Sequence, residues 1–134
     1  MMFNRFALAL AIVFSGGPAK AQLVSESGDE LLVCPDLPPE PELVSNMGLK
    51  ESHKAILIQR MYRATSYVAI LETGECSCAN RFPAWDTVVE YYLANYARLE
   101  ARFEVQERTK YYRNSIDQNR PAVRDLCIAQ DNWD

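Results

Sequence analysis

Two apolar stripes constrain the fold of this chain more than any other feature. In residues 49–72, apolar side chains recur at steps of 4, 3, 4 and 3 residues, and in residues 84–119 at steps of 4, 3, 4, 3 and 4. This spacing places them on one narrow helix face that packs against another helix. The first stripe consists of Leu57, Met61, Ala64, Val68 and Leu71, and the second of Trp85, Val89, Tyr92, Tyr96, Leu99 and Phe103.

The residues at the ends of the stripes predict an antiparallel helical hairpin. Gly74 favours a helix end after Thr73, and Pro83 favours a new helix start after the loop of residues 75–84. The second helix is expected to be long, from about residue 84 to 119, because Pro121 disfavours a helix interior. A short C-terminal helix is expected over residues 121–130. No alternating strand pattern occurs, so we expect an all-α fold.

The first 21 residues have the layout of a secretory signal peptide. A basic residue, Arg5, precedes an apolar run over residues 6–14, and Ala19-Lys20-Ala21 forms a small-residue cleavage site before Gln22. The signal resembles a bacterial one, so we expect a periplasmic or secreted protein. The apolar run is too short to span a bilayer, and no membrane span is expected in the mature chain. A retained N-terminal anchor is the alternative.

Residues 22–48 form the predicted N-terminal arm. Four prolines, namely Pro35, Pro38, Pro39 and Pro41, lie within seven residues. Closely spaced prolines favour an extended, polyproline-like path and oppose a helix. We therefore expect a signal peptide over residues 1–21, an extended arm over 22–48 that lies across the helices, and a helical domain over 49–134. A proline-rich ligand for an aromatic groove is the alternative role of the arm.

The charge of the chain limits its partners. The sequence has 14 basic and 18 acidic residues, a net charge of −4, and signal cleavage would remove Arg5 and Lys20 and make the mature chain more acidic. Nucleic-acid binding relies on clustered Lys and Arg, so no nucleic-acid partner is expected. No polybasic segment points to anionic lipid either. Another protein is the expected partner.

The four cysteines, Cys34, Cys76, Cys78 and Cys127, predict disulfides in an exported chain. A straight second helix of residues 84–119 would span about 50 Å and would keep Cys127 far from the loop. In that case Cys34 pairs with Cys127. If the helix instead bends near residues 106–110, Cys127 folds back to Cys76 or Cys78, and Cys34 takes the other.

The Cys76-Ser77-Cys78 loop supplies an alternative function, since a closed pair there would be a strained, labile disulfide suited to thiol–disulfide exchange. Metal binding is not expected, because the lone His53 lies about a helix length from these thiols. No cofactor is expected. Without a recognisable nucleophile–base pair or carboxylate pair, we expect a binding protein rather than an enzyme.

The apolar stripe of the second helix breaks after Phe103, where Gln106 and Lys110 take the next positions. A shifted stripe continues the apolar face, and Tyr91, Tyr111 and Tyr112 cannot all fit the original one, so some aromatic surface should remain exposed. Exposed aromatic residues beside arginines are typical of protein interfaces. The hypothetical partner-binding residues are Val105, Tyr111, Tyr112, Arg113 and Ile116.

Together these features favour a small exported helical protein that acts by protein–protein interaction. Its size, signal and hairpin are compatible with accessory components of bacterial envelope, secretion or conjugation assemblies, by analogy of architecture alone. An inhibitor or a chaperone-like module has the same sequence features.

Overall fold

The computed structural model describes residue 34 and residues 37–133 of the chain, and this part is all-helical. The predicted signal peptide and residues 22–33 of the predicted arm lie outside the described residues. The elements are α1 (Glu42–Ser45), the 3₁₀-helix η1 (Leu49–Glu51), α2 (Ser52–Thr73), α3 (Cys78–Arg81), α4 (Asp86–Asn95) and α5 (Arg102–Ala129).

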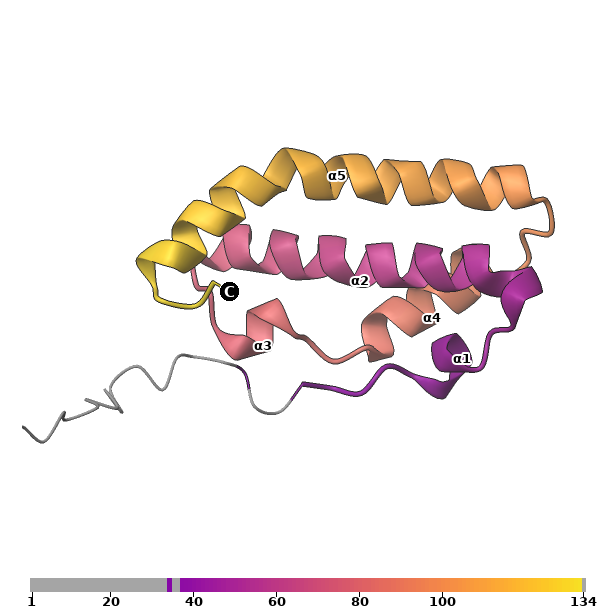
Figure 1. Cartoon of the computed structure of the whole chain (residues 1–134), viewed down its shortest axis with the longest axis horizontal. Coiled ribbons are helices and arrows are strands. Elements are labelled where there is room, and N and C mark those ends of the chain that lie inside the picture. Colours follow the sequence, from indigo (N-terminus) through magenta and orange to yellow (C-terminus); the bar gives the residue numbers. More distant parts are fainter. Residues whose placement is uncertain (1–33, 35–36, 134) are drawn as a thin grey trace, which may run out of the picture.

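Helix α2 is the centre of the fold. Within the described residues, every pair of elements in substantial contact includes α2. Helix α5 lies along one side of α2, while α1, α3 and α4 lie on the other (Figure 1). The sequence supports this position because α2 buries a face wider than the predicted stripe: Leu57, Ile58, Met61, Ala64, Ser66, Tyr67 and Ile70.

The predicted single long second helix is wrong, although the part that forms α4 does pack antiparallel on α2. Helix α4 ends at Asn95, the chain turns, and α5 begins at Arg102. Helix α4 runs antiparallel to α2, but α5 runs parallel to it, so the starts of α2 and α5 lie together at one end of the molecule (Figure 1). The residues that the apolar pattern assigned to one helix therefore form two helices, which lie on different sides of α2.

The break between α4 and α5 has no local sequence signal, since neither glycine nor proline occurs in residues 95–101. The Ala97 amide donates to the Tyr92 carbonyl over 3.0 Å, which closes the end of α4. Beyond the turn, Val105 and Ile116 are 0% and 1% exposed. A straight continuation of α4 would have carried these side chains past the end of α2. Burial of the α5 face against α2 is the physical reason for the break.

Pro121 lies inside α5, contrary to the predicted helix break at residues 119–120, and the predicted short C-terminal helix is the last part of α5. A proline in a helix interior removes one amide donor and bends the helix. Helix α5 indeed bends in its second half (Figure 1). Pro121 is exposed, so the carbonyl left without a donor can reach water, while Val123 and Cys127 are turned into the core.

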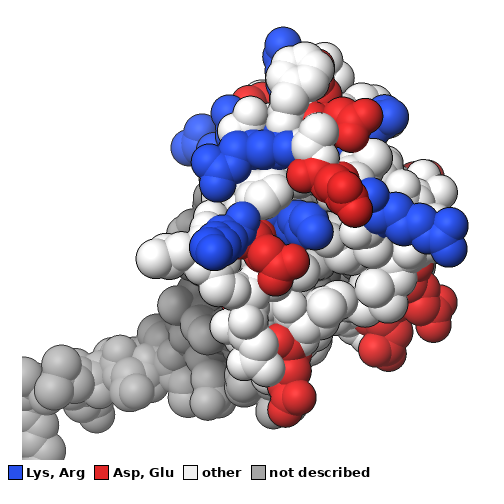
Figure 2. Space-filling view, turned by 90° about the vertical axis from the view of Figure 1, so that its right-hand side faces the viewer, with Lys and Arg blue, Asp and Glu red and all other residues white. Residues whose placement is uncertain are grey.

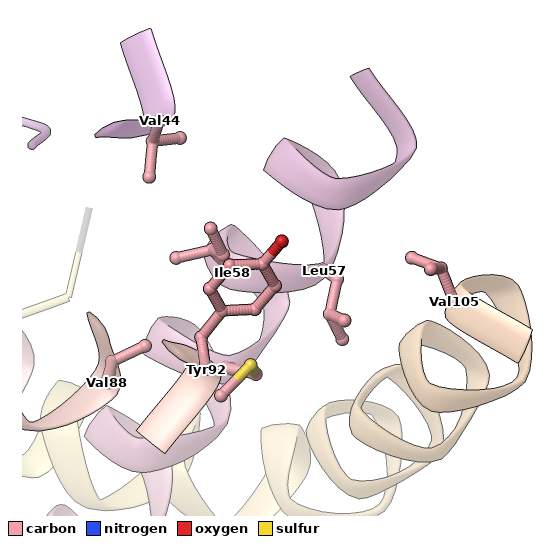
Figure 3. Packing of buried hydrophobic residues seen from close by; sticks show 7 residues of the cluster. Val44, Leu57, Ile58, Val88, Tyr92 and Val105 are labelled. Carbon is pink, nitrogen blue, oxygen red and sulfur yellow. The ribbon is translucent and has the colours of Figure 1, made fainter. Parts of the chain in front are cut away.

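Two apolar clusters form the core. We name the end that holds the starts of α2 and α5 the open end, and the other the stapled end. The open-end core joins residues of four helices, with the Tyr92 ring between neighbours from α2 (Figure 3): Val44, Leu57, Ile58, Met61, Val88, Tyr92 and Val105. The stapled-end core consists of Ala64, Tyr67, Ile70, Cys76, Ile116, Val123 and Cys127. Tyr112 packs against both.

The prediction of a disulfide-bonded fold is confirmed. Cys34 bonds to Cys78 with a Cα–Cα distance of 5.3 Å, and Cys76 bonds to Cys127 with one of 5.1 Å. This is the pairing expected for a chain that folds back, although the turn lies at residues 96–101 rather than at 106–110. Disulfides of this kind indicate folding in an oxidising compartment. Among the described residues, no helix has the length and apolarity needed to cross a bilayer.

The described part of the predicted arm is only partly extended. Residues 37–41 follow a non-helical path, and Pro41 then caps α1, whose Val44 is buried in the open-end core. The arm is held at two further places, since Gln59 of α2 donates to Glu40 over 2.7 Å and the Cys34–Cys78 disulfide ties the arm to α3. The arm thus lies across the helices.

Candidate functional site

A groove between α4 and α5 is the first candidate site, with α2 as its floor. It arises because α4 and α5 each pack on α2 and make few direct contacts with each other. Its volume is about 200 Å³ and its lining is mainly apolar. We name it the tyrosine groove, and its lining residues are Met61, Thr65, Thr87, Val88, Tyr91 and Tyr112.

Four tyrosine rings form a continuous chain that includes two lining residues of this groove, Tyr91 and Tyr112. Tyr91 contacts Tyr96 at a centroid distance of 5.7 Å, Tyr96 contacts Tyr112 at 6.3 Å, and Tyr112 contacts Tyr111 at 5.2 Å. All three contacts are edge-to-face, the arrangement that the ring quadrupoles favour. The four rings therefore orient one another and present a preformed aromatic surface.

The outer rings of this chain are open to solvent. Tyr91 is 49% exposed and Tyr111 is 67% exposed, while Tyr96 and Tyr112 are half-buried. The guanidinium of Arg108 lies 5.9 Å from the centre of the Tyr96 ring, which adds a cation to this chain of rings. Exposed aromatic surface next to arginine is the composition found at the centres of protein interfaces.

The two inner tyrosines are linked through their hydroxyl groups, which lie 3.1 Å apart. Burial, together with this hydrogen bond to Tyr96, raises the pKa of Tyr112 above its ordinary value. The neighbouring Tyr96 likewise raises the pKa of Tyr91. Both hydroxyl groups therefore keep their protons to a higher pH than a free tyrosine does.

The structure divides the predicted partner-binding residues into two groups. Val105 and Ile116 lie in the core, so their side chains are not accessible to a partner in this conformation. Tyr111 and Arg113 are exposed, and Tyr112 lies half-buried in the groove. The prediction that some aromatic surface remains exposed is confirmed by Tyr91 and Tyr111. Sequence reasoning missed the floor that α2 supplies, because the groove depends on the unpredicted turn between α4 and α5.

The cysteines form no closed Cys76–Cys78 pair. Each of these residues bonds to a distant cysteine, and Cys76 and Cys127 are 3% and 0% exposed. The structure therefore does not support the thiol–disulfide exchange alternative. Among the described residues, no three His, Cys, Asp or Glu side chains come close enough together to hold a metal ion.

A larger hollow of about 480 Å³ lies at the open end, between α1, η1 and α4. Its lining mixes the carboxylates of Glu42 and Glu51 with Lys54 and with apolar side chains. Figure 2 faces this end of the molecule and shows acidic and basic side chains interspersed over it. The lining of this hollow is therefore neither mainly apolar nor of one charge, whereas the lining of the tyrosine groove is mainly apolar.

The second candidate site is a basic pocket of about 300 Å³ at the stapled end, lined by four arginines and two aromatic residues.

Comparisons with protein-family models, with curated proteins and with solved structures found no match to this chain. Its function is therefore inferred from its own residues.

Proposed function

We propose that this protein acts after export by binding another protein through the tyrosine groove. The observation that carries the proposal is the exposure of Tyr91, which lines a mainly apolar groove, and of Tyr111, whose ring contacts the lining residue Tyr112. Burial of large exposed aromatic side chains by a partner contributes strongly to the binding free energy. Tyr and Arg dominate the binding energy of many interfaces.

The size of the groove favours a partner side chain over a small-molecule ligand. Small-molecule pockets are typically about 300–1,000 Å³ in volume. The tyrosine groove measures about 200 Å³, which suits one anchoring apolar side chain. The hydroxyl groups of Thr65 and Thr87 add polar groups at its lining. A partner segment with one apolar anchor and flanking polar groups is the expected occupant.

The proposed setting is the periplasm or the extracellular space. The expected signal peptide and the two disulfides support it, because such bonds form in oxidising compartments. We propose an accessory role in a bacterial envelope, secretion or conjugation assembly, by analogy with the size and the helical architecture of such components.

Site-specific photo-cross-linking tests the proposal in the native cell. A photoreactive phenylalanine analogue is placed at position 111 of the full-length chain, and in a control at position 128. Ile128 is also exposed on α5, at 48%, but lies about 25 Å further along the helix. We expect one discrete protein adduct from position 111 and none from position 128. No adduct, or the same adduct from both positions, would contradict the groove as the binding site.

A variant of the groove separates binding from folding. The double substitution Tyr91→Ala and Tyr111→Ala removes exposed rings, so thermal stability should change little while the partner affinity falls. An Ile116→Ala variant is unsuitable for this purpose, because Ile116 is 1% exposed and its loss would create a core cavity. An unchanged partner affinity in the double variant would overturn the proposal.

A further inference from the structure

We propose that the stapled end carries a binding site for a small anion with two or more negative charges on phosphate or carboxylate groups. The site is the pocket of about 300 Å³ introduced above, which we name the arginine pocket. It is separate from the tyrosine groove and goes beyond the proposed function. Its lining residues are Arg60, Arg63, Tyr67, Arg81, Arg120 and Trp133.

The four guanidinium groups come from three helices. Arg60 and Arg63 lie three residues apart on α2 and share one face, with Tyr67 one turn further on. Arg81 is the last residue of α3, and Arg120 comes from the bent half of α5. No acidic residue lines the pocket. In a chain whose net charge is −4, this is a local reversal of sign.

The positive charge of the pocket is poorly compensated by the rest of the described chain. Over residues 34 and 37–133, the ion pair that forms is Lys54–Glu51, and Arg60, Arg63 and Arg120 have no carboxylate partner there. Like charges that converge on one pocket repel one another. A bound anion would relieve this repulsion, and the effect should weaken with added salt.

The walls of the pocket are held in place before any ligand binds. Arg81 donates from Nη1 to Oδ1 of Asn132 over 2.9 Å, and the Arg81 carbonyl accepts from Ser66 Oγ over 2.8 Å. Asn132 donates in turn to the carbonyl of Cys76, which is bonded to Cys127. The disulfide network thus fixes α3 and the C-terminal tail relative to α2. Such preorganisation lowers the entropy lost on binding.

The lining residues define the chemistry of the ligand. A guanidinium group presents a planar fork of donors that matches a carboxylate or a phosphate. Arg60, Arg63 and Arg120 alone carry three positive charges, more than a single negative charge can balance, so a multivalent anion fits best. The ring of Tyr67, with Arg63 6.0 Å from its centre, and the indole of Trp133 give the pocket an aromatic wall.

Titration calorimetry and thermal unfolding of the oxidised, exported chain test the site with three probes. Pyrophosphate and citrate carry several negative charges, and acetate carries one. We expect pyrophosphate, citrate or both to bind and to raise the melting temperature, with an affinity that falls as salt increases, and acetate to do neither. A preference for pyrophosphate assigns a phosphate ligand, and one for citrate a polycarboxylate. Absence of binding by both overturns the proposal.

Matched charge variants locate the binding. Arg63→Gln with Arg120→Gln should weaken binding by about tenfold or more, because two charge-assisted hydrogen bonds are lost. Arg98→Gln with Arg102→Gln removes the same charge at the open end, far from the pocket, so an effect of about twofold or less is expected from long-range charge alone. Equal losses in the two double variants would overturn the site.

The Asp134 side chain is a carboxylate of the chain itself that can compete with a ligand for the pocket. Asp134 follows Trp133 in the sequence and lies outside the described residues. The variant Asp134→Asn should bind pyrophosphate or citrate as the natural chain does. If binding appears only in this variant, the pocket belongs to an internal carboxylate and the proposal fails.

Discussion

The two ends of the molecule are held together by different forces. At the open end, α1, α2, α4 and α5 each contribute apolar side chains to one cluster. At the stapled end, the cluster comes mainly from α2 and α5, and it contains the Cys76–Cys127 disulfide itself. Four interlocking elements can hold one another by packing alone. A pair of parallel helix ends has fewer neighbours, and here a covalent bond supplements the packing.

Directional hydrogen bonds add to this difference. At the stapled end, Gln130 accepts from the Cys76 amide over 2.7 Å and donates to the Gly74 carbonyl over 2.9 Å. These bonds satisfy backbone groups of the loop that follows α2, where no helical partner is available. The stapled end therefore depends on specific covalent and hydrogen-bond partners, whereas the open end depends mainly on buried apolar volume.

Loss of the Cys76–Cys127 disulfide should lower the stability of the stapled end more than any other change considered below lowers stability. The variant Cys76→Ser/Cys127→Ser opens a loop of 51 residues, and chain entropy predicts a loss of about 4 kcal/mol in the free energy of unfolding. Denaturant unfolding measures it. The control Cys34→Ser/Cys78→Ser should lose less, because the exposed arm can loosen in the folded state. A larger loss in the control would place the critical staple on the arm.

Truncation of Leu57 should destabilise the open-end core. Leu57 is 0% exposed, so Leu57→Ala is expected to cost about 3 kcal/mol through lost burial and a cavity. Hydrogen exchange should then increase in α1 and α4 more than in α3. Leu93→Ala removes the same side chain from a position that is 52% exposed and should cost less than about 0.5 kcal/mol. Uniform loss of protection in all helices would show that the two ends unfold together.

Tyr112 joins the two cores, so its hydroxyl offers a test of their coupling. Tyr112→Phe removes the hydrogen bond to Tyr96 and should cost about 1 kcal/mol at neutral pH. Thermal or denaturant unfolding measures this loss. Tyr111→Phe changes an exposed ring and is the control, with little effect expected.

The same side chain predicts a dependence on alkaline pH. The pKa of Tyr112 in the folded state lies above the ordinary value of 10.0, so above pH 10 the unfolded chain loses this proton first. The contribution of Tyr112 to the free energy of unfolding is fully present below pH 10, and it is lost as the pH rises toward the pKa of the folded state. Unfolding measured from pH 8 to 11 should therefore show a decline that is smaller in Tyr112→Phe. An identical decline in the natural chain and in Tyr112→Phe would refute this role of Tyr112.

The smallest expected effect concerns the end of α2. Gly74 has φ 69°, and an added Cβ would meet no atom within 4 Å, so Gly74→Ala should cost about 1 kcal/mol through backbone strain alone. Gly48 has φ −72° and open space around it, and Gly48→Ala should therefore leave stability unchanged or slightly increased. Equal effects of the two substitutions in thermal unfolding would show that the turn after Thr73 adapts.

Sequence reasoning predicted helices better than their arrangement. Gly74 ended the first helix as expected, and Leu57, Met61 and Ala64 of its stripe are buried. The outer stripe positions Val68 and Leu71 are 40% and 37% exposed, because α5 lies along a different side of α2. Of the candidate site, the sequence indicated surplus tyrosines but not the groove that they border.

By itself, the sequence determined the all-helical content and the end of α2, because helix propensity and a left-handed glycine act over short range. It also indicated disulfide cross-links, through an even number of cysteines in a short chain. Only the tertiary structure decided the turn at residues 96–101, the parallel course of α5, the place of Pro121 and the pairing of the cysteines. These features follow from burying Val105, Ile116 and Cys127 against α2. The free energy of this apolar burial outweighs local helix propensity at the turn and at Pro121. The arginine pocket depends on the same long-range packing, since its residues come from segments that meet only in the folded chain.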